Sequence, residues 1–112
     1  MVNKWKLCID VSCYPNLGRA IIAYVLVNNV SHEAFQRNWD ISARTTNNEA
    51  YYVALIEGLK AAKNYGANDI SFFTNSTLMC NQILGVHQVR KVNLKPLHKE
   101  AKTLLFNFNH LR

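Results

Sequence analysis

The chain has 112 residues, 49% of them hydrophobic, so it can bury one modest core and has no room for a second domain. No apolar run approaches the roughly 20 residues of a membrane span, and Met1–Lys6 lacks the apolar block of a signal peptide. We therefore expect one soluble domain over residues 1–112, located inside the cell in the cytoplasm or nucleus. The formal net charge of the chain at pH 7 is +6.

Three β-strands are expected in the N-terminal part of the chain. Residues 5–10 alternate apolar and polar side chains, which places Cys8 and Asp10 on the same face of a strand. Residues 20–27 form a second, strongly β-prone run, and residues 32–41 form a third strand nearer a sheet edge. Short turns join the three segments, which predicts an antiparallel meander.

A long helix is expected from about Asn48 to Tyr65. Thr46 and Glu49 have the spacing of a capping box at its start, and Gly66 is well placed as its C-terminal stop. One narrow stripe of this helix contains only small residues, which would let it lie close against a sheet: Ala50, Ala54, Gly58 and Ala62.

The rest of the chain is expected to form one strand and two helices. Residues 69–74 read as a short strand parallel to the first, because a helix separates it from the meander. Residues 76–84 and 94–108 have helical spacing of apolar residues, and residues 86–93 connect them. The expected order is therefore strand, strand, strand, helix, strand, helix, helix.

Three short motifs follow one another along the chain: Ile9-Asp10-Val11-Ser12, Thr46-Asn47-Asn48-Glu49-Ala50-Tyr51-Tyr52 and Phe73-Thr74-Asn75-Ser76. In this order they resemble the ribonuclease H family, especially its plant-type and retroelement-type domains. The resemblance implies an α/β fold with a mixed sheet, in which a three-strand antiparallel meander joins a parallel fourth strand and three helices. Because residue 112 precedes the family's last elements, we expect the final strand and the final helix to be absent.

The same resemblance implies a metal site that has lost most of its ligands. Family members hold two divalent ions with several carboxylates, and such hard ions need converging oxygen ligands. Asp10 is the only ligand retained here, since Tyr51 and Asn75 stand at two further carboxylate positions. We expect no catalytic residues and no bound magnesium or other cofactor. A hydrogen-bonded vestigial cluster of Asp10, Tyr51 and Asn75 is predicted in place of the metal site.

Other residues of the chain do not restore that site. Glu49 leaves the helix about 200° away from Tyr51, so we assign it to the capping box. We assign His87, His98 and His110 to the surface or to linkers. Cys8, Cys13 and Cys80 are odd in number and lack zinc-site spacing, so we expect reduced thiols, with Cys8 and Cys80 packing as small hydrophobes. Four aromatic residues could stack on bases, although packing in the core is the simpler interpretation: Tyr14, Trp39, Tyr51 and Tyr52.

The positive charge is concentrated after Gly85, where six basic groups face one acidic group, a balance of +5. Residues 1–84 hold seven basic and six acidic groups, a balance of +1. The basic cluster either neutralises nucleic-acid phosphates or is an ordinary solvated helix face. The candidates for phosphate contact are Arg90, Lys91, Lys95, Lys99 and Lys102.

Two functional hypotheses follow. In the first, the chain is a catalytically inactive module for protein interaction or self-association, and the exposed edge of the fourth strand pairs with a protein partner or forms a homodimer. In the second, the basic residues hold an RNA·DNA hybrid or a duplex without cutting it. Residual cleavage of RNA·DNA hybrids is a third, weaker alternative.

Overall fold

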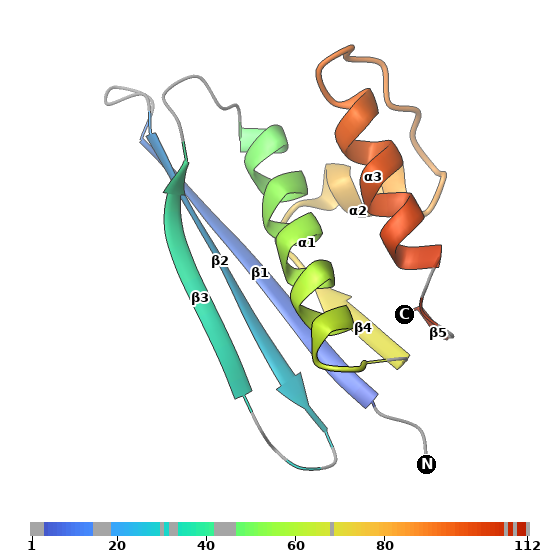
Figure 1. The fold of residues 1–112 in the computed structure, drawn as a ribbon. Helices are drawn as coiled ribbons and strands as arrows, with labels where there is room; N and C mark the ends of the chain where they lie inside the picture. The colour runs from blue at the N-terminus through green and yellow to red at the C-terminus, as the bar shows by residue number, and fades with distance from the viewer. Residues whose placement is uncertain are drawn as a thin grey trace.

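A computed structural model describes residues 4–14, 19–29, 31, 34–41, 47–67, 69–106, 108 and 110–111 (Figure 1). Residues 15–18, between the first two predicted strands, and the predicted cap residue Thr46 lie outside the described residues. So do the side chains of Cys13, Tyr14, Trp39 and His110, although their strands are described.

The strands form one mixed sheet in the order β3-β2-β1-β4-β5. β1 (Lys4–Tyr14), β2 (Arg19–Asn28) and β3 (Ala34–Ile41) are the predicted antiparallel meander. β4 (Asp69–Phe73) pairs with β1 in parallel, as predicted from the helical crossover between them.

A fifth strand corrects the expectation that the last strand of the fold is absent. β5 (His110–Leu111) pairs in parallel with β4, where Asp69 lies opposite His110 and Ile70 opposite Leu111. Phe108 is buried and its amide donates to the Leu105 carbonyl at 3.1 Å, which turns the chain after α3 towards the sheet. The open edge of β4 offers unpaired backbone groups, and two residues of β5 satisfy part of them.

α1 (Asn47–Asn64) lies across β1 and β2 on its stripe of small residues, and it ends where predicted, at Gly66 with φ +81°. Ala50, Ala54 and Ala62 are fully buried on that stripe. A Cβ atom added at Gly58 would lie 2.6 Å from Cδ1 of Leu7 in β1. The absent side chain therefore sets how closely helix and sheet approach.

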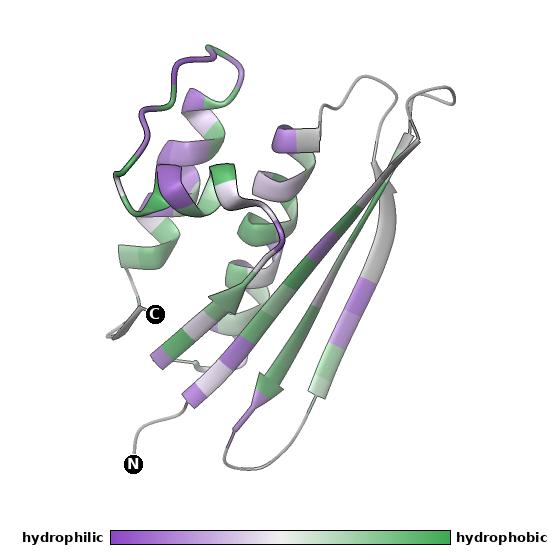
Figure 2. Cartoon of the chain, turned by 180° about the vertical axis from the view of Figure 1, so that it is seen from behind, coloured by the Kyte–Doolittle hydropathy of each residue, from purple (hydrophilic) through white to green (hydrophobic). Residues whose placement is uncertain are grey.

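The two shorter helices stand beside α1. Ser76 caps α2 (Thr77–Ile83), because its Oγ accepts the amide of Met79 at 3.1 Å. α3 (Lys95–Phe106) packs against α1 and also contacts α2. All three helices lie on the same side of the sheet in Figure 1, and the view from behind in Figure 2 shows the other face without a described helix over it.

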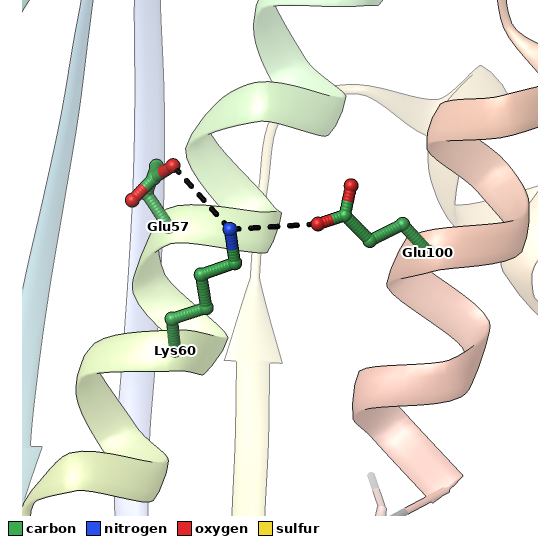
Figure 3. A network of polar contacts seen from close by, with 3 residues as sticks. All are labelled: Glu57, Lys60 and Glu100. Carbon is green, nitrogen blue, oxygen red and sulfur yellow. Dashed lines mark ion pairs between the residues drawn. The ribbon is translucent and has the colours of Figure 1, made fainter.

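A small ion network joins α1 to α3 at the surface (Figure 3). Lys60 Nζ lies 4.0 Å from Glu57 Oε1 within α1 and 3.5 Å from Glu100 Oε2 of α3. All three side chains are well exposed, so solvent screens the pairs and their contribution to stability is small. The main consequence of the ion network is that the Glu100 side chain is oriented towards α1.

In the part of the chain that the structure describes, no helix has both the length and the apolar character needed to cross a membrane.

Candidate functional site

Asp10 lies in the central strand. Trp5, Leu7 and Ile9 of the same strand are buried, whereas Asp10 alternates with them and is exposed. Its side chain is exposed and Oδ1 accepts the backbone amide of Val11 at 2.9 Å.

The other two members of the predicted vestigial cluster come from neighbouring elements. Cys8 of β1 and Phe73 of β4 form the last pair of the parallel ladder, and Asp10 and Asn75 each follow that pair by two residues. Asn75 is exposed just after β4, and Tyr51 is half-buried near the start of α1. The hydrogen-bonded cluster of Asp10, Tyr51 and Asn75 stays a prediction.

The donor set of these residues does not fit a two-ion centre. Asp10 supplies one carboxylate, whereas Tyr51 supplies a phenol and Asn75 a neutral amide. Within the described ranges, no group of three or more His, Cys, Asp or Glu side chains is arranged to hold a metal ion.

Glu49 has a partner that the capping-box interpretation did not include. Its Oε1 accepts a hydrogen bond from Nδ2 of Asn93 at 2.8 Å, 44 residues further along the chain. This contact ties the end of the 84–94 connection to the first turn of α1. The connection carries Arg90 and Lys91, so both basic residues belong to a segment anchored at the first turn of α1.

The predicted phosphate-contacting residues of α3 share one face of the helix. Lys95, Lys99 and Lys102 are all exposed, and at 100° per residue they fall within an arc of about 60°. Glu100, the acidic residue of α3, leaves the helix on the side that faces α1. The arc is therefore a surface of uniform positive charge, and Arg90 and Lys91 of the preceding connection are also exposed.

Lys102 is held in place by α2. Its Nζ donates to the carbonyl oxygen of Ile83 at 3.1 Å, at the C-terminal end of α2. A cation at this position offsets the partial negative charge of the helix end.

His98 is a structural residue between helices, which corrects its assignment to the surface or a linker. It is half-buried, its Nε2 lies 3.2 Å from the carbonyl oxygen of Gln82, and its ring meets Tyr52 edge-on at 6.1 Å. The correction follows from packing, because residue 98 falls on the side of α3 that turns towards α2. His87 is exposed, as predicted.

Tyr52 and Gln82 form the buried polar contact beneath this region. The Tyr52 hydroxyl donates to Gln82 Oε1 at 2.7 Å, and burial raises the pKa of Tyr52 to about 12. Tyr52 therefore belongs to the core, which settles its alternative role as a stacking platform. Gln82 was missed by sequence reasoning, although it shares a helical face with buried Met79 and Ile83.

Two cavities flank these elements. One of about 560 Å³ lies between α2, the connection and α3, and Lys95, His98 and Lys102 contribute to its lining. The other, of about 480 Å³, is lined by Asn75 and by the half-buried free thiols of Cys8 and Cys80. The prediction of free thiols is confirmed for those two residues.

The chain matches a family model described as reverse transcriptase-like over residues 9–112. It is 33% identical over 100 residues to ribonuclease HI of Halobacterium salinarum, covering 89% of this chain and 50% of that protein. The chain thus spans about half the length of the curated relatives it matches.

Solved structures give the same assignment. The N-terminal RNase H domain of a Mycobacterium tuberculosis protein, solved as a fusion with maltose-binding protein, superposes with a TM-score of 0.88 at 28% identity, covering 98% of this chain and 79% of that one. LC11-RNase H1 in complex with an RNA/DNA hybrid gives 0.83 at 25% identity, covering 96% and 80%. The chain belongs to a ribonuclease H-like family, the one whose model is described as reverse transcriptase-like.

Proposed function

We propose that this chain is a ribonuclease H-like domain that binds an RNA·DNA hybrid or a related duplex by its phosphates and does not cleave it. The observation that carries the proposal is the arc of exposed Lys95, Lys99 and Lys102 on α3, with exposed Arg90 and Lys91 in the connection before it. A positively charged surface neutralises phosphates and releases counterions from nucleic acid, which is the usual basis of sequence-independent binding.

The connection that carries Arg90 and Lys91 is tied to α1. Asn93, at the end of this connection, donates a hydrogen bond to Glu49 in the first turn of α1. This contact supports the proposal because it holds the basic connection against the helix. The hybrid bound by LC11-RNase H1, a structural relative, makes a hybrid the first duplex to test.

Loss of cleavage is proposed from the chemistry of the donors. One carboxylate cannot neutralise two divalent ions, and neither the Tyr51 phenol nor the Asn75 amide adds negative charge at neutral pH. The domain would therefore be a pseudoenzyme that needs no magnesium for binding.

The binding test is fluorescence anisotropy with a labelled hybrid of about 16 base pairs, a length near the footprint of a small double-strand-binding domain. We expect log K to fall linearly with log salt, and the double variant Lys95→Glu with Lys99→Glu to lose most of the affinity. Lys63→Glu is the matched control, because Lys63 is an exposed cation at the far end of α1. Equal loss in both variants, or an affinity that is insensitive to salt, would contradict the proposal.

Self-association is a second candidate function, favoured by the edge of β4. In the described part of the chain, β5 pairs with Asp69 and Ile70 only, so the edge of Ser71–Phe73 is open to another strand. The side chain of Phe73 is 50% exposed beside it. Light scattering after size exclusion tests this alternative: a dimer that Phe73→Ser dissociates supports it, and a monomer at all concentrations excludes it.

A further inference from the structure

We propose that the cavity between α2 and α3 is a phosphate-binding pocket, built by His87, Lys95, His98 and Lys102. The inference rests on the proposed nucleic-acid role for its biological meaning, but the pocket has a ligand chemistry of its own. A phosphate group could come from a nucleic-acid backbone or from a free phosphorylated molecule, and both present the same oxygens.

The charged lining of the cavity has one sign. Among the residues that line its volume of about 560 Å³, the ionisable side chains are two lysines and two histidines, without a carboxylate. Glu100, the one acidic residue of α3, lies 3.5 Å from Lys60 and so is directed to α1, away from the cavity. A cavity whose lining holds two lysine ammonium groups and no carboxylate favours an anion.

The structure holds two of the four groups in position before any ligand arrives. Lys102 Nζ donates to the carbonyl of Ile83 at 3.1 Å, which leaves two of its three N–H groups for a ligand. His98 is fixed by the carbonyl of Gln82 at 3.2 Å and by the edge-on contact with Tyr52. Side chains ordered in this way lose less conformational entropy when a ligand binds.

The same two contacts remove an obstacle to anion binding. The last carbonyl groups of α2 point towards this region and would repel an anion through the negative end of the helix dipole. Lys102 and His98 contact two of these carbonyls, those of Ile83 and Gln82. Lys95, the first residue of α3, stands at the positive end of the other helix.

Phosphate fits this set better than a carboxylate does. Several separated N–H donors match the three or four oxygens of a phosphate, and lysine binds phosphate as a compact point charge. The volume is within the range of ligand pockets and exceeds that of one anion, so it admits a phosphate carried on a sugar or a longer strand.

The test is a titration of the isotope-labelled full chain with inorganic phosphate, followed by amide and histidine ring resonances at constant ionic strength. We expect saturable shifts in the amides of Gly85, His87 and Gln88 and in the His98 ring. Lys102→Met, which keeps the aliphatic stem, should weaken phosphate about tenfold. Lys95→Met should do the same without touching a contact to α2, and Lys63→Met should have no effect. Shifts that do not saturate, or that are unchanged in both pocket variants, would overturn the proposal.

A second arm identifies the source of the phosphate and separates this inference from the proposed function. If the pocket seats a backbone phosphate, inorganic phosphate competes with the hybrid and Lys102→Met lowers the salt slope by about one unit. If it seats a free phosphorylated molecule, hybrid affinity is unchanged while inorganic phosphate still saturates. If the protein binds the hybrid but its phosphate titration does not saturate, the phosphate pocket is refuted and the proposed hybrid-binding function stands. If the phosphate titration saturates but the protein binds no hybrid, the proposed function is refuted and the phosphate pocket stands.

Discussion

The hydroxyl of Tyr52 donates a 2.7 Å hydrogen bond to Oε1 of Gln82, joining α1 to α2 in the core. Tyr52 has no exposed surface and Gln82 is 94% buried, so neither group can replace its partner with water. A buried polar pair of this kind fixes how the two helices sit against each other, since a lost partner leaves an unsatisfied group. His98 contacts both residues, which links the core pair to the proposed phosphate pocket.

Burial of Tyr52 predicts a loss of stability at high pH. Burial raises its pKa from 10.0 to about 12, so above pH 10 the unfolded chain loses this proton while the folded chain keeps it. The stabilisation is complete below pH 10 and is lost between pH 10 and about 12, by roughly 2–3 kcal/mol. Urea unfolding at pH 8 and pH 11 measures this loss of unfolding free energy, with Tyr52→Phe as the control for all other titrating groups. An equal pH dependence in both proteins would refute the assignment.

Gly58→Ala is expected to destabilise the protein although it improves helix propensity. The added Cβ would lie 2.6 Å from Leu7 Cδ1, and overpacking costs about 1–3 kcal/mol against a gain of about 1 kcal/mol from replacing glycine. We expect a net loss of about 1 kcal/mol by urea unfolding. Leu7→Val should relieve the clash with the added Cβ atom. The double variant should therefore lose less unfolding free energy than the sum of the losses of the two single variants.

Gly85→Ala is the matched control for that experiment. Gly85 has φ +82° and nothing within 4 Å of an added Cβ, so its cost comes from the backbone alone. We expect no coupling between Gly85→Ala and Leu7→Val. Coupling of equal size at both glycines would mean that the close approach of α1 to β1 is not the cause.

Restoring two carboxylates is expected to restore metal binding. Tyr51→Glu with Asn75→Asp would put carboxylates at the two positions where the family resemblance implies them, and Asp10 and Asn75 each follow the last β1–β4 pair, Cys8 with Phe73, by two residues. Calorimetry with Mn²⁺ should detect binding in the double variant and none in the parent. The same residue types placed at the other end of α1, Tyr65→Glu with Asn64→Asp, should not bind Mn²⁺. If the two double variants behave alike, Tyr51 and Asn75 do not occupy ligand positions.

Asn93→Ala is expected to loosen the basic connection without unfolding the protein. Its hydrogen bond to Glu49 is exposed, so the change in unfolding free energy should stay within about 0.5 kcal/mol. Arg90 and Lys91 would lose their anchor, and hybrid affinity should fall roughly two- to fivefold. Amide hydrogen exchange across residues 86–93 reports the loosening. Asn64→Ala, an exposed change far from the connection, should alter neither quantity.

Local pattern was sufficient for most of the fold. The alternation of Trp5, Leu7 and Ile9 predicted β1, and the small stripe with Gly66 predicted the contact face and the end of α1. Such features depend on neighbours within one turn or one strand, so the sequence carries them directly. β5 was not predicted because a strand of two residues has no periodic pattern of its own and forms only by pairing with the edge of β4.

The same distinction applies to the candidate site. The basic residues of α3 were identified from charge and spacing, and their shared face follows from helix geometry. The contacts of His98 with Gln82 and of Glu49 with Asn93 span 16 and 44 residues, and no local pattern encodes them. Gln82 offered one usable signal, a polar residue within an apolar helical face, which often marks a buried hydrogen bond.

The most direct test combines binding and cleavage in one measurement. A hybrid with a labelled RNA strand is incubated with saturating protein and Mg²⁺ or Mn²⁺, and the same sample is resolved on native and denaturing gels. We predict a shifted complex in which the RNA strand stays intact. Metal-dependent cutting of that strand, abolished by Asp10→Asn, would contradict the account.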